Sequence, residues 1–223
     1  MTTAADYLDR CTRPTFFLDS DHPEIVAFAL DSAGGAAGAA AATRLFYAVR
    51  DRIRYDPYTV SNDPAAYRAS AILKRPAAFC TPKAVLLAAS ARALRIPARL
   101  GFADVHNHLQ SEKLRERMGT DLFVFHGYTE LWLNGRWLKA TPAFNAELCD
   151  RFGVAPLDFD GTEDAIFQAF TADGRRYMEY VRDRGSYDDL PLEEMLTTLR
   201  DVYGVDAQGA LSTNREDDES FLP

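Results

Sequence analysis

Residues 79–99 read FCTPKAVLLAASARALRIPAR, and this stretch decides the fold class. Its middle, from Pro82 to Leu94, is dominated by alanine and leucine, which have strong helix propensity and leave little polar surface. Proline is favoured at the first helical position, and the residues just before it, Cys80 or Thr81, suit the cap. We therefore predict a central helix over 82–94 that is buried on most sides and starts next to Cys80.

A β-hairpin follows further along the chain. Residues 122–133 read LFVFHGYTELWL, a run rich in aromatic and β-branched residues that predicts a strand. Asn134-Gly135 is the strongest short hairpin signal, so residues 136–141 are predicted to return antiparallel. The resulting register pairs Leu133 with Arg136, Trp132 with Trp137, Glu130 with Lys139 and Tyr128 with Thr141.

The hairpin register gathers polar side chains on one face, because residues two apart in a strand point the same way. That face holds His126, Tyr128, Glu130 and Trp132 from the first strand and Trp137, Lys139 and Thr141 from the second. Thr141 is then the diagonal neighbour of His126, with about 7–8 Å between their backbones. The spacing alone predicts a histidine with a partner on the adjacent strand.

The remaining segments supply helices and one more strand. Apolar residues at helical spacing predict a helix over 41–55, and turn and cap signals predict further elements. These are helices over 23–31 and 111–118, a strand over 98–105, and helices over 164–170, 175–184 and 192–203. We predict an α+β fold in which the central helix packs on an antiparallel sheet, with flanking N- and C-terminal helices.

The bulk composition is that of an ordinary globular protein. The chain has 223 residues, of which 47% are hydrophobic and 26% charged. This length fits a single domain over 1–205, with a core at about 40–145 and an acidic, disordered tail over 206–223. Three cysteines at low density predict free thiols in a reducing compartment, and the first residues show no secretory signal. We expect a cytoplasmic location.

The charge pattern argues against two classes of partner. The formal net charge is −8, and the local cluster Arg50, Arg52 and Arg54 is interleaved with acidic residues. Nucleic-acid binding needs a clustered basic surface, so we predict no nucleic-acid partner. The most apolar stretch, residues 34–42, is too short to span a bilayer, so we predict no membrane association.

Cys80 and His126 are the candidate catalytic residues. At a helix N-terminus the dipole and the free backbone N–H groups stabilise a thiolate, which lowers a cysteine pKa. The same N–H groups can donate to a developing oxyanion. A small buried cysteine that only caps the helix, and a hydrogen-bonded core histidine, are the structural alternatives for these two residues.

Two segments together resemble the transglutaminase-like superfamily. Residues 79–99 are similar to its nucleophile segment, in which a cysteine opens an Ala/Leu-rich helix that ends in Ile-Pro-Ala-Arg. Residues 125–145, FHGYTELWLNGRWLKATPAFN, are similar to its second signature, and the two come in the family's order. The resemblance implies a papain-like core with Cys80 as nucleophile, His126 as general base and no cofactor.

The chain departs from the family pattern at one position. Where the family usually has an aspartate before a proline on the returning strand, this chain has Thr141 before Pro142. Three alternatives follow. Thr141 can orient His126 as the third catalytic residue, a carboxylate such as Glu130 can stand in, or the site has lost catalysis. A threonine hydroxyl can fix the imidazole tautomer but supplies no negative charge.

Other residues extend the predicted site. Tyr128 and Glu130 share the face of His126, and His108 follows a strand near the cleft, so we predict that these three bind substrate. His106 and His108 form an H-x-H pair that could bind zinc with a third ligand, but ordinary loop histidines fit better and we predict no metal. Asp104 is expected in an exposed loop or turn.

The sequence as a whole predicts acyl transfer from an amide or ester, or its hydrolysis, through a Cys–His pair. The substrate is a peptide, a protein or a small amide or ester, and the sequence does not distinguish among them. The alternative is a non-catalytic transglutaminase-like module that binds a peptide or protein partner, which the threonine at position 141 favours.

Overall fold

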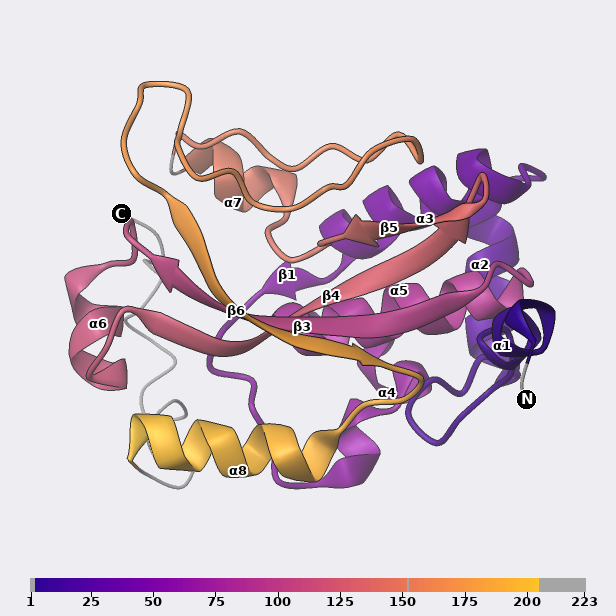
Figure 1. Cartoon of the computed structure of the whole chain (residues 1–223), viewed down its shortest axis with the longest axis horizontal. Helices are drawn as coiled ribbons and strands as arrows, with labels where there is room; N and C mark the ends of the chain where they lie inside the picture. Colours follow the sequence, from indigo (N-terminus) through magenta and orange to yellow (C-terminus); the bar gives the residue numbers. More distant parts are fainter. Residues whose placement is uncertain (1–2, 152, 205–223) are drawn as a thin grey trace.

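The computed structural model describes residues 3–151 and 153–204 (Figure 1). The predicted tail at 206–223 therefore lies outside the described residues. The elements in chain order are α1 (Ala4–Arg10), α2 (Pro23–Ala33), α3 (Gly38–Arg52), β1 (Arg54–Tyr55), the 3₁₀ turn η1 (Pro64–Tyr67), α4 (Ala69–Ile72), β2 (Ala77–Ala78), α5 (Cys80–Ala93), β3 (Ala98–Asn107), α6 (Glu112–Met118), β4 (Leu122–Leu133), β5 (Arg136–Ala140), α7 (Ala146–Arg151), β6 (Met178–Tyr187) and α8 (Leu192–Tyr203).

The predicted α+β architecture is confirmed. Four antiparallel strands form the main sheet in the order β5-β4-β3-β6, and the short strands β1 and β2 pair in parallel. Helix α5 packs on β4 and β3 and is covered from the other side by α2, α3 and α4 (Figure 1). The core is therefore the layer between α5 and the sheet.

Helix α5 starts at Cys80, two residues earlier than the sequence predicts. Phe79 is its N-cap, and Pro82 is the third helical residue rather than the first. All its residues from Cys80 to Arg92 are buried, as the alanine-rich composition indicates. Lys83 is also fully buried, and its Nζ donates to the carbonyls of Arg50 and Ile53, which ties α5 to the end of α3.

The hairpin register is confirmed where the strands pair. Leu133 opposes Arg136, Trp132 opposes Trp137, and Glu130 opposes Lys139. The turn residues Asn134 and Gly135 have φ of 52° and 82°, as a two-residue hairpin of this kind requires. Strand β5 ends at Ala140, one residue earlier than predicted, so Thr141 lies just past the ladder and its predicted pairing with Tyr128 does not form.

Downstream of the hairpin, two predicted helices are wrong. The range 175–184 is mostly strand β6, because its backbone pairs with the free edge of β3. The range 164–170 is not helical, because Ala165 bridges Ala140 and extends the sheet beyond β5. The helix over 192–203 is confirmed as α8, and α7 was not predicted.

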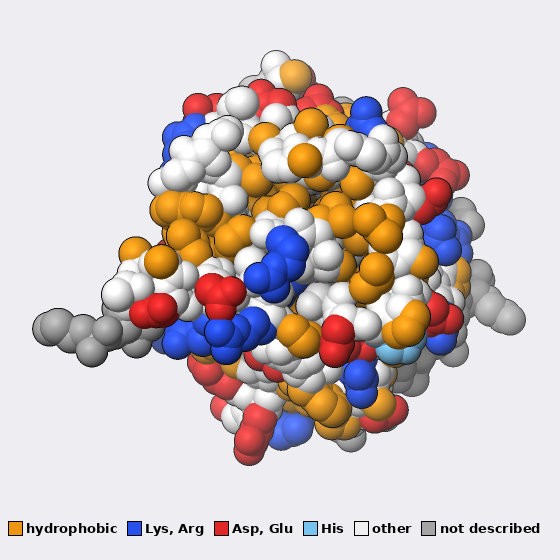
Figure 2. All heavy atoms as spheres, turned by 90° about the vertical axis from the view of Figure 1, so that its right-hand side faces the viewer, with side chains coloured by type: hydrophobic (Ala, Val, Ile, Leu, Met, Phe, Trp, Pro, Cys, Tyr) orange, Lys and Arg blue, Asp and Glu red, His pale blue; other side chains and the backbone are white. Residues whose placement is uncertain are grey.

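Two further features are the distribution of charged side chains on the surface and the length and apolar character of the helices. On the face in Figure 2, Lys and Arg side chains lie in small groups among acidic and hydrophobic ones. Within residues 3–151 and 153–204, no single helix has the length and apolar character needed to cross a membrane; α2 and α3 meet that test only as a pair bent by 109°.

Candidate active site

Cys80 is the first residue of α5. The chain reaches it through Phe79 in extended conformation, whose N–H donates to Thr59 Oγ1 at 3.1 Å. The N–H groups of a first helical turn have no partner inside the helix, and Pro82 contributes none. The N–H groups of Cys80 and Thr81 therefore remain as the donors of this turn.

His126 follows a β-bulge in β4. The pairing of β3 with β4 shifts by one residue between Ala103 and Val105, and Phe125 has a φ of 54°. A positive φ is strained for an aromatic residue, so the surrounding contacts must stabilise it. The bulge sets where the next residue, His126, projects.

An ion pair that the sequence did not predict stabilises this bulge. Asp104 accepts a hydrogen bond from the Phe125 N–H at 3.1 Å and another from the Arg184 guanidinium. The same guanidinium lies over the Phe125 ring, 4.4 Å from its centroid. Asp104 is only 4% exposed, so the expectation of an exposed loop or turn for it is wrong.

Helix α5, which starts at Cys80, and strand β4, which carries His126, are joined directly by hydrogen bonds. Thr81 Oγ1 donates to the carbonyl of Phe125 at 3.2 Å, and Thr129 Oγ1 donates to the carbonyl of Ala84 at 2.9 Å. Gly127 permits this approach, because a Cβ there would lie 2.8 Å from Thr81 Oγ1 and 2.9 Å from Thr81 Cα. A glycine inside a strand is the signal that could have indicated this contact.

Cys80 and His126 line the same cavity, which has a volume of about 50 Å³. Apart from these two residues, its walls are apolar or aromatic. Helix α8 forms one wall through Met195, Leu199 and Tyr203. Both catalytic candidates are buried, with 8% of Cys80 and 6% of His126 exposed, so both side chains are largely shielded from solvent.

Burial controls the charge state of the pair. It raises the pKa of the Cys80 thiol, although the backbone N–H of Gly127 and the Thr81 hydroxyl oppose the shift. Burial also lowers the pKa of His126 to about 4. The helix start therefore does not produce a lowered thiol pKa here, because desolvation outweighs it. At neutral pH the pair is a thiol and an uncharged imidazole.

The third predicted catalytic residue, Thr141, is buried at the end of β5. Its N–H donates to Ala165 O at 3.0 Å, whereas its Oγ1 has no hydrogen-bond partner among the described residues. His126 Nε2 is buried and likewise has no partner there. The His126 ring packs against Phe167, with 5.4 Å between centroids.

The predicted substrate-binding residues do not line this cavity. Gly127 and Thr129 contact α5, so Tyr128 and Glu130 lie on the opposite face of the sheet. There Glu130 binds Arg99 and accepts a hydrogen bond from Ser186 at 2.8 Å. Lys139 Nζ lies over the Tyr128 ring, 4.9 Å from its centroid. Both Glu130 and Tyr128 therefore already interact with other side chains on that face.

The histidine pair after β3 also lies apart from the cavity. His108 Nε2 contacts Glu179 at 3.1 Å, and His106 Nδ1 contacts Asp121 at 2.8 Å. The two rings stack with 6.0 Å between centroids. Among the residues the structure describes, no group of three or more His, Cys, Asp or Glu side chains is arranged to hold a metal ion.

Comparison with known proteins identifies the family. A sequence model of the transglutaminase-like superfamily matches residues 27–142, which is about half of the chain and includes Cys80, His126 and Thr141. The chain belongs to the transglutaminase-like superfamily. Among solved structures, a candidate cysteine protease from Cytophaga hutchinsonii is similar, with 20% identity and a TM-score of 0.46 over 60% of this chain. The similarity spans 41% of the length of that protein. A search of curated proteins found no match to the chain.

Proposed function

We propose that this transglutaminase-like protein is a cysteine enzyme that cleaves an amide or ester by acyl transfer or hydrolysis. The supporting observation is that Cys80, at the start of α5, and His126, on β4, line one cavity. Cys80 is the nucleophile and His126 is the general base. Both lie in the segment that matches the superfamily.

In the first step the Cys80 sulfur attacks the substrate carbonyl carbon and the thiol proton moves to His126. The N–H groups of Cys80 and Thr81 can stabilise the resulting oxyanion. The carbon–nitrogen or carbon–oxygen bond then breaks, and the amine or alcohol leaves with the proton from His126. Water or an amine attacks the thioester, releases the acid or a new amide, and restores the thiol.

The uncharged state of the pair determines how His126 acts. Because burial raises the pKa of Cys80 and lowers that of His126, the resting site holds no thiolate–imidazolium pair at neutral pH. The proton must therefore transfer as the carbon–sulfur bond forms, which is general-base catalysis rather than attack by a preformed thiolate.

Thr141 is proposed as a positioning residue for His126. Both Thr141 Oγ1 and His126 Nε2 are buried without hydrogen-bond partners among residues 3–151 and 153–204. A bond between them would satisfy both atoms and fix the imidazole tautomer with Nδ1 free for the thiol proton. Glu130 is a weaker candidate for this role, because Arg99 and Ser186 already bind its carboxylate.

The proposed substrate is a peptide, a protein or a small amide or ester, with no nucleic-acid or membrane partner. The net charge of −8 supports the exclusion of nucleic acid. Cys11, Cys80 and Cys149 are all free, which supports a reducing, cytoplasmic environment.

Trapping of an acyl-enzyme tests the proposal. Wild type, His126→Ala and Cys80→Ser are incubated with p-nitrophenyl acetate, and acylated peptides are mapped by mass spectrometry. We expect acetyl-Cys80 in wild type and a rate lower by about 10²-fold in His126→Ala. Cys149→Ser is the control, since it removes another buried free thiol. Absence of acetyl-Cys80, or an unchanged rate without His126, would favour the non-catalytic binding module.

A further inference from the structure

The cavity beside Cys80 has a chemically uniform wall. Its lining includes Phe123, Val124 and Phe125 from the start of β4, Met118 from the end of α6, and residues of α8. Among residues 3–151 and 153–204, no Lys, Arg, Asp or Glu side chain lines it. A charged group that entered would lose its hydration without gaining an ionic partner, which is strongly unfavourable.

Helix α8 is a fixed part of this wall. The Tyr203 hydroxyl accepts a hydrogen bond from the Val124 N–H at 3.0 Å and donates to the Leu122 carbonyl at 3.2 Å. Met195 is fully buried and Leu199 is 6% exposed, so the apolar side of α8 rests against the cavity. Figure 1 shows α8 along the side of the sheet away from α7. Because α8 follows the segment that matches the superfamily, this wall belongs to the chain's own C-terminal part.

The cavity volume limits what can enter. A water molecule occupies about 30 Å³ in the liquid, so a cavity of about 50 Å³ has room for only a few non-hydrogen atoms. A methyl or methylene group is somewhat larger than water. The space therefore favours a short chain beyond the reacting carbonyl over a long one.

We propose that this cavity is the acyl pocket of the enzyme, that it selects short uncharged aliphatic acyl groups, and that Leu199 sets the length limit. The inference rests on the proposed function, because it names the acyl donor for the Cys80–His126 pair. An ester R–CO–OR′ loses its carbonyl–oxygen bond, the acyl carbon bonds to Cys80 Sγ, and R′OH leaves with the thiol proton carried by His126. The chain R occupies the cavity.

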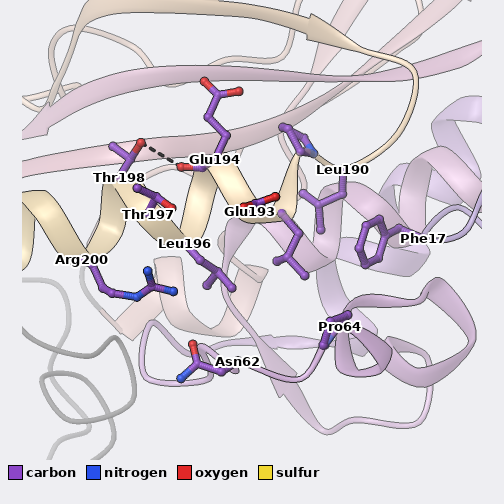
Figure 3. Close-up of a pocket in the computed structure, with 12 residues that line it drawn as sticks. Phe17, Asn62, Pro64, Leu190, Glu193, Glu194, Leu196, Thr197, Thr198 and Arg200 are labelled. Carbon is purple, nitrogen blue, oxygen red and sulfur yellow. Dashed lines mark hydrogen bonds between the residues drawn. The ribbon is translucent and has the colours of Figure 1, made fainter.

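The α8 helix offers a matched control for Leu199. Leu196 lies on the same helix and is 7% exposed, close to the 6% of Leu199. It faces a different hollow, together with Phe17 and Pro64 (Figure 3). Leu199→Ala and Leu196→Ala each remove a buried leucine from α8, but only the first enlarges the cavity. Leu199→Phe fills part of the cavity and creates no new void.

The first experiment measures the pocket without requiring catalysis. Alkyl methanethiosulfonates modify a thiol by forming a disulfide and releasing methanesulfinate, so the rate at Cys80 reports access of the alkyl chain. We expect the propyl reagent to exceed both the octyl and the charged sulfonatoethyl reagents by at least about tenfold, after correction for rates with a free thiol. Leu199→Ala should raise the octyl rate about tenfold, Leu199→Phe should lower the propyl rate, and Leu196→Ala should change neither.

The second experiment measures acyl transfer with p-nitrophenyl esters of acetate, butyrate, octanoate and succinate. We expect butyryl-Cys80 to form fastest, octanoyl and succinyl at least about tenfold more slowly, and Leu199→Ala to restore octanoyl. Equal rates for all chains with normal acylation would overturn the pocket while leaving the proposed function intact. A chain preference with the thiosulfonates but no ester acylation would support the pocket and reject the proposed function. If neither the thiosulfonates nor the esters show a preference for short uncharged chains, the proposed acyl pocket is rejected.

Discussion

Thr81, the residue after Cys80, donates a hydrogen bond to the carbonyl of Phe125, the residue before His126, at 3.2 Å. This one bond fixes the start of α5 on the bulge of β4, and so relates the side chains of Cys80 and His126, the proposed catalytic pair, through their immediate neighbours. Gly127 completes the contact from the other side of His126, where only a hydrogen atom fits against Thr81. The relative position of Cys80 and His126 is therefore determined by the contact between the start of α5 and β4.

Replacement of Thr81 by valine tests this contact. The variant keeps the shape of the side chain but leaves the Phe125 carbonyl without its donor, which should reduce the free energy of unfolding by about 1–3 kcal/mol. The acylation rate at Cys80 should fall, since α5 is no longer fixed against β4. Urea denaturation and acetyl-Cys80 formation measure the two effects. Thr81→Ser retains the hydroxyl and is the control, and wild-type rates in Thr81→Val would show that the bond does not position the pair.

Gly127→Ala tests the close approach of α5 to β4. The new Cβ would lie 2.9 Å from Thr81 Cα, and a backbone atom cannot move away as the end of a side chain can. We expect a stability loss of about 1–3 kcal/mol and slow acylation of Cys80. Gly101→Ala is the matched control, because its Cβ would meet the Tyr128 ring on the opposite face. If both variants reduce stability equally and also slow acylation equally, the effect is one of folding only.

The hairpin and the central helix could be predicted because their signals are local. Asn134-Gly135 determines its own turn and thereby the register of β4 and β5, and the alanine-rich run from Ala84 to Ala93 is helical in almost any context. The bulge could not be predicted, because it depends on Asp104 and on Arg184, which lies 80 residues further along the chain. The helix predicted over 175–184 was wrong for the same reason. Strand β6 forms there because it pairs with the edge of β3, which lies far away in the sequence.

The face of the sheet on which Tyr128 and Glu130 lie illustrates a second limit of prediction from the sequence. Alternation along β4 correctly places these two residues together. It cannot show which face of the sheet α5 covers, nor that the cavity beside His126 ends before Tyr128 and Glu130. Likewise, apolar spacing predicts α8, but its position over Cys80 follows only from packing.

Asp104→Asn tests the bulge. The change leaves Arg184, whose side chain is 9% exposed, without its counter-charge, and breaking a buried ion pair in this way costs about 3–5 kcal/mol. We expect this loss in urea denaturation, together with slower acylation of Cys80. The double variant Asp104→Asn/Arg184→Gln removes the unpaired charge and should recover part of the stability but not the acylation rate. Full recovery of both would mean that the bulge does not need the pair.

The pH dependence of stability tests the burial of His126. Its pKa is lowered from 6.5 to about 4 in the folded protein, so the unfolded chain binds the proton more readily. Stability should be unaffected by this group above pH 6.5 and should fall as the pH decreases from 6.5 to about 4. At pH 5 the loss from this residue is on the order of 2 kcal/mol. It is measured as the difference between wild type and His126→Gln in urea at pH 7 and pH 5, and equal losses in both proteins would contradict it.

Substitution of Thr141 decides whether this position acts on His126. Thr141→Val keeps the shape and removes a buried hydroxyl that has no partner among the described residues, so stability should hold or increase. If Thr141 positions the imidazole during catalysis, the same variant should nonetheless lower the acylation rate of Cys80. Thr141→Asp would place a carboxylate beside the ring and raise the His126 pKa, which narrows the pH range over which stability falls. It should also move the pH profile of Cys80 alkylation to lower pH. An unchanged alkylation profile in Thr141→Asp, with an unchanged acylation rate in Thr141→Val, would show that position 141 does not contact His126.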